Sequence, residues 1–432
     1  MKTRGLFSRF IPTAAIILIL LTLLSGCAKK EEKKREGKIE KPESQLSWPT
    51  CYHDPQRTGR GVSSGPQSPQ VLWIQELGVQ SKAFAVLDKN ENIIAPAQGK
   101  ISCLDKTSGK PIWEFPTQGA SATIACISND GTIYASAGNI VYSISPEGSA
   151  KWSFDMGSLA DQPSVSEDGF IYVGSTGGRL VALNKEGKIK WEQKVPGNIR
   201  SPSFSRDGDL LCSASPLVLY CFDENGKKKW EFKPEGELPL YDGMFDWANT
   251  LEAPSVGDDG TIYAGSFVSP GVTKTGQQIP GYSFPSKAKV YAITPRGEKK
   301  WEYQTQEQTG STILTPSIGR DGTLYSGTSF MKVLAFTPEG TLTWEFNTAE
   351  PPNVCPFVYS PSIGKDGLLY AATSSSRIFC ITPQGIEKWR YGGENPWLPD
   401  MTGSNNFTPS PIAKDGKIYS ILFQGKVYAF SP

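Results

Sequence analysis

The sequence predicts an all-β fold, an eight-bladed β-propeller of four-stranded antiparallel blades whose ring is closed by an N-terminal strand. Three observations support this prediction. A pattern ending in tryptophan recurs at a fixed spacing, each repeat contains four short apolar runs joined by turn residues, and the last repeat lacks its fourth run. A period of about 40 residues with four strands in each repeat is typical of a propeller.

The recurring pattern is clearest in the third repeat. There it runs from Pro163-Ser164 through Asp168-Gly169 and Ile171-Tyr172 to Trp191. Equivalent tryptophans are Trp113, Trp152, Trp230, Trp301, Trp344 and Trp389, and successive tryptophans from Trp113 to Trp230 are 39 residues apart. Four strands of about 5 residues with tight turns fill such a repeat.

The strands of the third repeat are expected at residues 163–166, 170–175, 180–184 and 188–193. Asp-Gly pairs separate the first and second strands of most repeats, at Asp130-Gly131, Asp168-Gly169, Asp207-Gly208, Asp259-Gly260, Asp321-Gly322, Asp366-Gly367 and Asp415-Gly416. Asp-Gly suits a tight hairpin because the turn needs positive φ angles. No helical period of 3.6 residues follows the N-terminal region, so no helix is expected there.

Ring closure follows from the two ends of the chain. The last repeat stops at Pro432 without a fourth strand, and residues 71–75, which contain Trp73, form a fourth strand with no repeat of its own. Joining these ends completes the eighth blade and removes two exposed strand edges. A column of small residues in the third strands indicates tight packing between blades; its members are Cys103, Ser143, Ala182, Cys221, Ala292, Ala335, Cys380 and Ala429.

The N-terminus has the features of a secretory signal. Lys2, Arg4 and Arg9 precede an apolar stretch from residue 11 to 24, and Leu-Ser-Gly-Cys follows at residues 24–27. This arrangement resembles a bacterial lipoprotein signal, which implies cleavage before Cys27 and acylation of that residue. The apolar stretch is short for a membrane span of about 20 residues. The predicted organisation is a signal peptide at 1–26, the lipidated Cys27 with a charged tether at 27–46, and the propeller at 47–432.

Charge and cysteine usage limit the classes of partner. Removal of the three signal-peptide cations changes the formal net charge from +1 to −2, which argues against nucleic-acid binding. Five of the eight cysteines fall at small positions in the repeats, where buried thiols behave as small apolar groups. A disulfide between Cys51 and Cys355, which lie outside the repeat columns, remains open as an alternative in an oxidising compartment.

The repeats resemble those of the PQQ-like (pyrroloquinoline-quinone-type) propellers. The opening from Trp48-Pro49 to Arg60 and the segment from Leu104 to Trp113, close to Asp-x-x-Thr-Gly-x-x-x-Trp, carry the resemblance. Some members of this family are dehydrogenases that hold PQQ and calcium over the ring axis. Others have lost the cofactor, such as the lipoprotein propeller of the outer-membrane β-barrel assembly machine. The resemblance therefore implies either an enzyme or a scaffold.

Departures from the enzymes favour the scaffold. The chain has neither the adjacent cysteine pair of the dehydrogenases nor a Cys-x-x-Cys-His haem motif. His53 is the only histidine, and a packing or capping role is expected for it because no second imidazole is available for a catalytic or zinc site. No cofactor is expected, and PQQ with calcium is the alternative.

Long connections break the repeat on one face of the predicted ring. From Trp191 to Pro202 is 11 residues, whereas from Trp230 to Pro254 is 24 and from Trp389 to Pro409 is 20; the connection between residues 267 and 287 gains about 19. Variable loops on a rigid scaffold are common binding sites, and aromatic residues and methionine are enriched in interfaces. The predicted binding residues, for which capping of the ring end is the alternative role, are Tyr241, Phe245, Trp247, Tyr282, Phe284, Trp397 and Met401.

The function hypothesis is a membrane-anchored extracytoplasmic lipoprotein that acts as a non-catalytic binding or assembly scaffold through this loop face. Its partner would be an envelope protein or polymer. The alternatives are a PQQ-dependent dehydrogenase, and a carbohydrate or small-ligand binding protein in which Trp247 and Trp397 stack on sugars. Ala28 follows Cys27 in place of the aspartate that retains some lipoproteins at an inner membrane, so a cell with two membranes would place the protein in the outer one.

Overall fold

A ring of β-sheets forms the part of the chain that the structure describes. The computed structural model describes residues 46–78, 84–122, 126–200, 202–234, 250–268, 287–306, 312–348, 357–392, 407–422 and 424–432. The chain divides into two compact units, 1–44 and 45–432, and the described residues all belong to the second. They contain strands β1 to β31 but no helix, and therefore none that could cross a bilayer.

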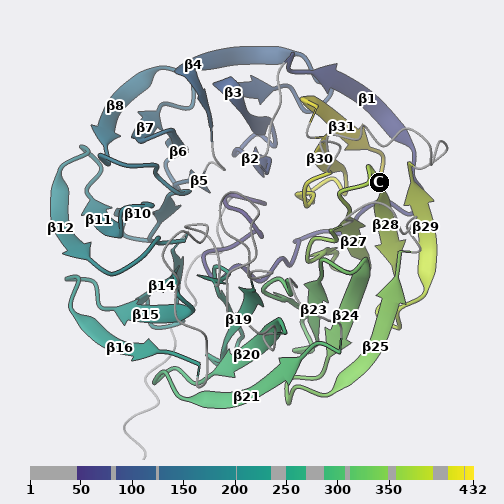
Figure 1. The fold of residues 1–432 in the computed structure, drawn as a ribbon. Helices are drawn as coiled ribbons and strands as arrows, with labels where there is room; N and C mark the ends of the chain where they lie inside the picture. Colours follow the sequence, from purple (N-terminus) through teal and green to yellow (C-terminus); the bar gives the residue numbers. More distant parts are fainter. Residues whose placement is uncertain are drawn as a thin grey trace, which may run out of the picture. The chain divides into compact units, whose positions relative to one another are not determined.

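Eight antiparallel sheets are arranged around a central axis, and Figure 1 shows them as the blades of a propeller viewed along that axis. The innermost strands are β2 (Val86–Leu87), β5 (Cys126–Ile127), β9 (Ser164–Val165), β13 (Ser203–Phe204), β18 (Ser255–Val256), β22 (Ser317–Ile318) and β26 (Ser362–Ile363). The second strands are β6 (Ile133–Ala137), β10 (Ile171–Gly174), β14 (Leu210–Ala214), β19 (Ile262–Phe267), β23 (Leu324–Gly327), β27 (Leu369–Ala372) and β30 (Ile418–Leu422).

The outer half of each blade holds the third and fourth strands. The third strands are β7 (Ile140–Ile144), β11 (Arg179–Leu183), β15 (Val218–Phe222), β20 (Lys289–Ile293), β24 (Lys332–Phe336), β28 (Ile378–Ile381) and β31 (Lys426–Phe430). The fourth strands are β4 (Pro111–Ser121), β8 (Ala150–Asp155), β12 (Ile189–Lys194), β16 (Lys228–Phe232), β21 (Lys299–Gln304), β25 (Leu342–Asn347), β29 (Glu387–Tyr391) and β1 (Val71–Glu76).

Three blades vary this plan. In the first, β3 (Ile93–Leu104) occupies the second and third positions, since it pairs with both β2 and β4. In the fifth, β17 (Thr250–Leu251) pairs with β19 beside β18. In the last, the bridge between Ile412 and Ile418 takes the place of the innermost strand. The prediction of eight four-stranded blades is confirmed.

Burial differs between the strands because neighbouring blades cover them unequally. Second strands such as β6 and β14 are buried at every residue, since blades pack against both of their faces. Fourth strands such as β8 and β12 alternate between exposed and partly buried residues, because their outer face meets solvent. The fourth strands therefore form the outer wall of the ring.

Each tryptophan of the outer wall contacts the next blade. Trp152 shows the arrangement: its indole Nε1 donates a hydrogen bond to the Lys185 carbonyl at 2.7 Å, and its ring lies against Gly187, which has a φ of 76°. The same bond joins Trp73 to Lys106, Trp113 to Pro146, Trp191 to Glu224, Trp230 to Pro295, Trp301 to Pro338 and Trp344 to Pro383. The recurring turn glycine therefore makes room for an indole of the preceding blade.

The predicted column of small residues lies directly opposite these tryptophans. Ala182 pairs with Trp191 across β11 and β12, and Cys380 pairs with Trp389 across β28 and β29. The other members occupy the same register and are buried, which leaves room for close packing between sheets. The last pair of this kind is Ala429 with Trp73.

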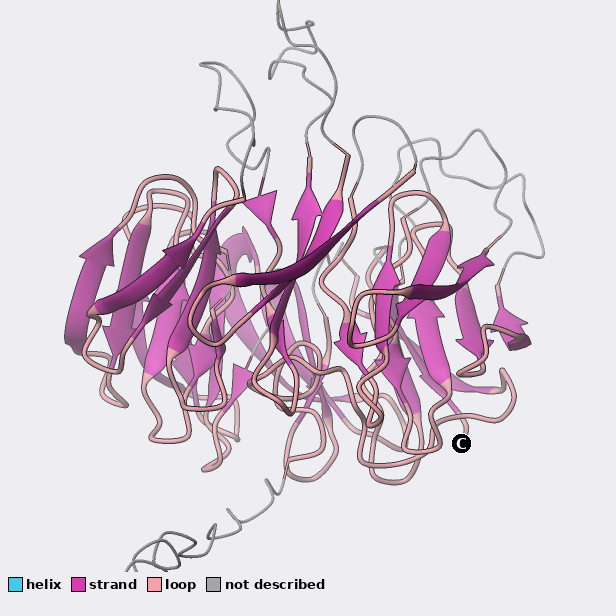
Figure 2. Ribbon diagram, turned by 90° about the horizontal axis from the view of Figure 1, so that it is seen from below, coloured by secondary structure: helices cyan, strands magenta, loops and turns pink. Residues whose placement is uncertain are grey.

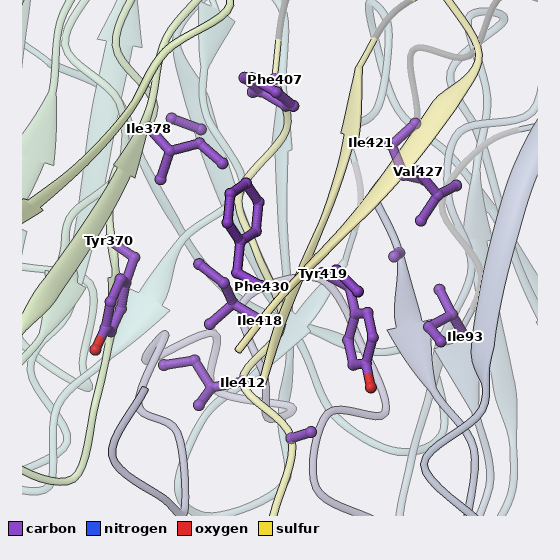
Figure 3. Close-up of a cluster of buried hydrophobic side chains, with 14 of the residues drawn as sticks. Ile93, Tyr370, Ile378, Phe407, Ile412, Ile418, Tyr419, Ile421, Val427 and Phe430 are labelled. Carbon is purple, nitrogen blue, oxygen red and sulfur yellow. The ribbon is translucent and has the colours of Figure 1, made fainter. Parts of the chain in front are cut away.

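The N-terminal strand closes the ring as predicted. β1 pairs antiparallel with β31, and the order of the last sheet is β1-β31-β30. Because the last blade has no turn between its third and fourth strands, Trp389 of the preceding blade bonds to the Pro66 carbonyl at 3.1 Å instead. Figure 3 shows the core at this junction, where Tyr370, Phe430 and Ile93 come from the seventh, eighth and first blades.

The sequence pattern did not reveal the course of residues 46–66, which we call the axial segment. It runs through the centre of the ring and is drawn in purple in Figure 1. Its carbonyl groups accept hydrogen bonds from the last residue of six innermost strands: Leu87 to Trp48, Ile127 to Pro49, Phe204 to Pro55, Val256 to Gln56, Ile318 to Thr58 and Ile363 to Gly59, at 2.8–3.1 Å. These bonds satisfy N–H groups at strand edges that would otherwise face the axis.

Candidate functional site

The loop residues predicted to bind a partner lie outside the described residues. These are Tyr241, Phe245, Trp247, Tyr282, Phe284, Trp397 and Met401, and Cys27 also lies outside them. The strand ends that flank these loops are described: β16 ends at Phe232, β19 ends at Phe267 and β29 ends at Tyr391. In a four-stranded meander these ends share one face, which we call the loop face. Figure 2 shows the ring from its side, with the two faces above and below.

Six residues at the inner side of the loop face occupy equivalent backbone positions, which we call the axial positions. Each donates its backbone N–H to a carbonyl of the neighbouring second strand, at 2.8–3.0 Å: Asp161 to Gly174, Arg200 to Ser213, Glu252 to Gly265, Leu314 to Gly327, Tyr359 to Ala372 and Thr408 to Ile421. The backbone is the same in six blades, but the side chain differs in every one. Chemical variation on a constant frame is what a specific binding surface requires.

Repeat alignment could have found the axial positions from sequence. In five blades the axial residue lies two positions before the proline that opens the innermost strand, as Asp161 precedes Pro163 and Tyr359 precedes Pro361. The signal was that this one position holds a different residue type in every repeat, whereas the positions around it recur. The sequence prediction relied on loop length and aromatic content, and these features indicate the long loops rather than the axial positions.

Four aromatic rings gather beside the axial positions. Tyr52 comes from the axial segment, Phe84 from the first blade, and Phe357 and Tyr359 from the seventh. The ring centroids are 5.9 Å apart for Tyr52 and Phe84, 5.9 Å for Phe84 and Tyr359, and 5.2 Å for Phe357 and Tyr359. All four side chains are partly buried, so this axial cluster joins two blades that are not neighbours while still meeting solvent.

One charged axial residue, Glu252, lies near enough to act on this cluster. Burial raises the pKa of the Tyr52 phenol well above its usual value, and the nearby negative charge of Glu252 adds to the shift. Arg200 and Glu252 are each partly exposed, and no ion pair joins either of them to another described residue. A partly exposed guanidinium such as that of Arg200 is suited to bind a carboxylate of a partner.

His53 and its neighbours stabilise the axial segment. The His53 ring packs edge-on against Trp48 with centroids 5.2 Å apart, and its Nδ1 lies 3.3 Å from Asp54 Oδ2. Burial alone would raise the pKa of Asp54, but hydrogen bonds from His53 and Thr58 lower it overall. Tyr52 and His53 have φ angles of 59° and 78°, which side chains rarely adopt. The packing role predicted for His53 agrees with these contacts.

Neither a metal nor a reactive thiol is suggested by the described residues. They contain no group of three or more His, Cys, Asp or Glu side chains that could hold a metal ion. Burial raises the pKa of Cys51, Cys103, Cys221 and Cys380 to about 12, so these thiols stay protonated. Cys51 is free, and Cys355, its possible disulfide partner, lies outside the described residues.

Comparison with known proteins identifies the repeat family. The family model described as outer membrane protein assembly factor BamB matches residues 62–163, 137–241 and 235–432. No curated protein matches the sequence.

Solved structures share the fold at low sequence identity. BamB from Moraxella catarrhalis is 14% identical, covers 84% of this chain and 100% of its own, and has a TM-score of 0.62. The C-terminal WD40 domain of Sif2 is 11% identical, covers 86% and 99%, and also has a TM-score of 0.62. Sqt1 from Chaetomium thermophilum is 13% identical, covers 84% and 99%, and has a TM-score of 0.59. At such identities the likeness concerns the fold alone.

Proposed function

This chain belongs to the family of the outer membrane protein assembly factor BamB, and we propose that it is a non-catalytic envelope scaffold that binds another protein through its loop face. The observation that carries this proposal is the set of axial positions, where six blades hold the same backbone but six different side chains. A protein partner offers the varied chemistry that such a surface would recognise.

The axial cluster supports a protein partner over a polymer. Tyr52, Phe84 and Tyr359 provide a partly exposed aromatic patch, and Glu252 places a negative charge near it. Buried aromatic anchors surrounded by charge are typical of protein–protein hot spots. The predicted loop residues Tyr241, Phe245, Trp247, Tyr282, Phe284, Trp397 and Met401 would extend this surface outward.

The anchor is the second part of the proposal. Acylation of Cys27 would fix the protein to a membrane outside the cytoplasm, and residues 28–45 would link the lipid to the ring. Leu46, the last residue of the predicted tether 27–46, is 4% exposed and packs in the core of the first and second blades, so it belongs with the ring. Labelling with a clickable fatty acid should mark the wild-type chain and not Cys27→Ser; equal labelling of both would show that the lipid is elsewhere.

Site-specific photocrosslinking in the native cell tests the binding face. A crosslinker at Arg200 or Tyr359 on the loop face should capture a defined protein, which mass spectrometry identifies. The matched controls are Asn129 and Lys365, which are exposed in the turns of the opposite face. The same adducts from both faces, or none from the loop face, would refute the proposal.

The two alternatives receive less support. A PQQ-dependent dehydrogenase needs room at the axis and oxygen ligands for calcium, but the axial segment runs through the centre of the ring and bonds to six innermost strands there. Among the described residues, no three or more acidic side chains cluster closely enough to hold a calcium ion. A carbohydrate binder would depend on Trp247 and Trp397, and a glycan array with Trp→Ala variants separates it from a protein scaffold.

A further inference from the structure

The outer wall departs from its repeat pattern in two adjacent blades. The residue before each outer tryptophan is a lysine in five blades and a threonine in a sixth: Lys151, Lys190, Lys229, Lys300, Lys388 and Thr343. In the last and first blades it is Leu72 and Ile112, which are 44% and 54% exposed. β1 and β4, which carry them, lie next to each other in Figure 1. Two neighbouring blades therefore expose aliphatic groups where the others expose charge.

A second departure lies on the same strand. The residue after the tryptophan is polar or charged in seven blades: Glu114, Ser153, Glu192, Glu231, Glu302, Glu345 and Arg390. In β1 it is Ile74, which is 50% exposed. Leu72 and Ile74 thus flank Trp73 on the solvent face of β1. This is the one outer strand among the described blades that is apolar on both sides of its tryptophan.

The other outer strands are protected by charge. Glu192 of β12 pairs with Arg179 at 2.9 Å, and Glu345 of β25 pairs with Lys332 at 2.9 Å. Exposed lysine on an edge strand discourages pairing with another strand, because a second strand would have to desolvate it. β1 pairs with β31 on one edge and with no described strand on the other. Its free edge therefore lacks the charged side chains that other outer strands carry beside the tryptophan. The β-bulge is common to both, since Leu72 is the unpaired bulge residue of β1 as Lys190 is of β12.

We propose that β1 is a self-association edge, which pairs antiparallel with β1 of a second copy across a two-fold axis at Trp73. In this register Leu72 of each copy lies opposite Ile74 of the other, and Gln70 lies opposite Glu76. The same operation on β29 would oppose Lys388 and Arg390, and on β12 it would oppose Lys190 and Glu192. Only β1, among the described outer strands, joins apolar residues to apolar residues when paired with itself.

The self-complementary sequence is the reason to name a second copy as the occupant. A two-fold interface uses the same strand in both subunits, so it closes as a dimer and leaves no free β1 edge. Antiparallel pairing also directs the two loop faces in opposite directions. The dimer would present the axial positions twice, which goes beyond the binding role proposed above and does not depend on it.

Sedimentation velocity across a concentration series tests the dimer. The chain 45–432 is suitable because it forms a compact unit that contains all the blades. Leu72→Lys combined with Ile74→Lys places lysine opposite lysine in this register and should weaken dimerisation about tenfold or more, since two apolar cross-strand pairs are replaced by like charges. The control Ile189→Lys removes an equally exposed isoleucine (47%) from the third blade and should leave the dimer intact.

Two results would overturn the proposal: a wild-type chain that stays monomeric at every concentration, or a dimer that the double substitution leaves unchanged. Circular dichroism melts of the variants separate lost association from lost folding. In cells, the full chain with Leu72→Cys and Ile74→Cys should form dimers under a mild thiol oxidant. Lys190→Cys with Glu192→Cys, on β12, is the matched control and should not.

Discussion

The outer wall and the axis of this ring use the same repeat in different ways. At the outer wall, Trp152 and its seven equivalents donate the same indole hydrogen bond to the adjoining turn or segment. At the axis, residues such as Asp161 and Tyr359 share a backbone hydrogen bond but differ in side chain. The uniform contacts hold blades together, whereas the varied ones are free to recognise a partner. The contacts that hold the blades together and the residues proposed to bind a partner therefore lie in separate columns of the repeat.

The axial segment connects the two regions. Its carbonyls bond to six innermost strands, and the carbonyl of its last residue, Pro66, accepts hydrogen bonds from the Trp389 indole and the Tyr370 hydroxyl. A Cβ on Gly65 would lie 2.6 Å from the Tyr370 ring, so the segment passes closely against the seventh blade. A single stretch of chain thus fills the centre and then closes the perimeter as β1.

The largest expected effect comes from removing this connection. Deletion of residues 28–76 takes away the axial segment and β1, exposes strand edges at six blades and in the last sheet, and should abolish cooperative thermal unfolding. Deletion of residues 28–45 should leave the melting temperature unchanged, because the charged composition of this tether cannot form a core. Similar melts for both truncations would show that neither ring closure nor the axial segment stabilises the blades.

The next effect separates a docked tryptophan from an exposed apolar residue. Trp389 is 8% exposed, and Trp389→Ala should lower the free energy of unfolding by about 3–5 kcal/mol through lost packing. Ile386, in the turn before it, is 65% exposed, and Ile386→Ala should change it by less than about 0.5 kcal/mol. Denaturant titration measures both. Equal losses would contradict a stabilising role for the tryptophan contact.

A pair of glycines distinguishes packing from backbone strain. Gly187 and Gly78 have similar φ angles, 76° and 78°, but a Cβ on Gly187 would lie 2.7 Å from Trp152, whereas no described atom lies within 4 Å of one on Gly78. Gly78→Ala should cost about 1–2 kcal/mol for the left-handed backbone. Gly187→Ala should cost about 1–3 kcal/mol more because the indole must move. If the two variants have the same melting temperature, the turn glycines are needed only for their positive φ angles and not to make room for the indole.

Axial substitutions should have a smaller effect on stability and a larger one on binding. Arg200→Ala removes a partly exposed side chain with no ion pair to a described residue, so the free energy of unfolding should change by about 0.5 kcal/mol or less. Capture of the partner in the crosslinking assay should fall sharply. Glu167→Ala, in a turn of the opposite face, is the control. A destabilised Arg200→Ala protein with normal capture would place the axial positions with the structural contacts instead.

The smallest effect is a pH dependence in one turn. Hydrogen bonds from Ser128 and Thr132 outweigh burial and lower the pKa of Asp130 to about 2. The stabilisation from this ionised group is therefore present above the unfolded pKa near 4 and is lost as the pH falls toward 2. Asp130→Asn should flatten the stability profile slightly in that window. A steeper profile in the variant would show that the carboxylate does not stabilise the turn.

The sequence by itself determined the repeated part of this protein. The spacing of the tryptophans, the Asp-Gly turns and the unpaired strand at residues 71–75 predicted eight blades and the closure of the ring. These features are recoverable because each blade meets the same neighbour, so the same residue types recur at the same spacing. The column of small residues opposite the tryptophans could be predicted from the sequence for the same reason.

Only the tertiary structure revealed the axis. The axial segment contacts six blades through backbone carbonyls, which any residue supplies, so its sequence carries no periodic signal. The axial cluster joins Tyr52, Phe84 and Tyr359 across more than 300 residues of chain, and no local pattern encodes such a meeting. Contacts that occur once, between distant segments, depend on the closed ring that brings them together.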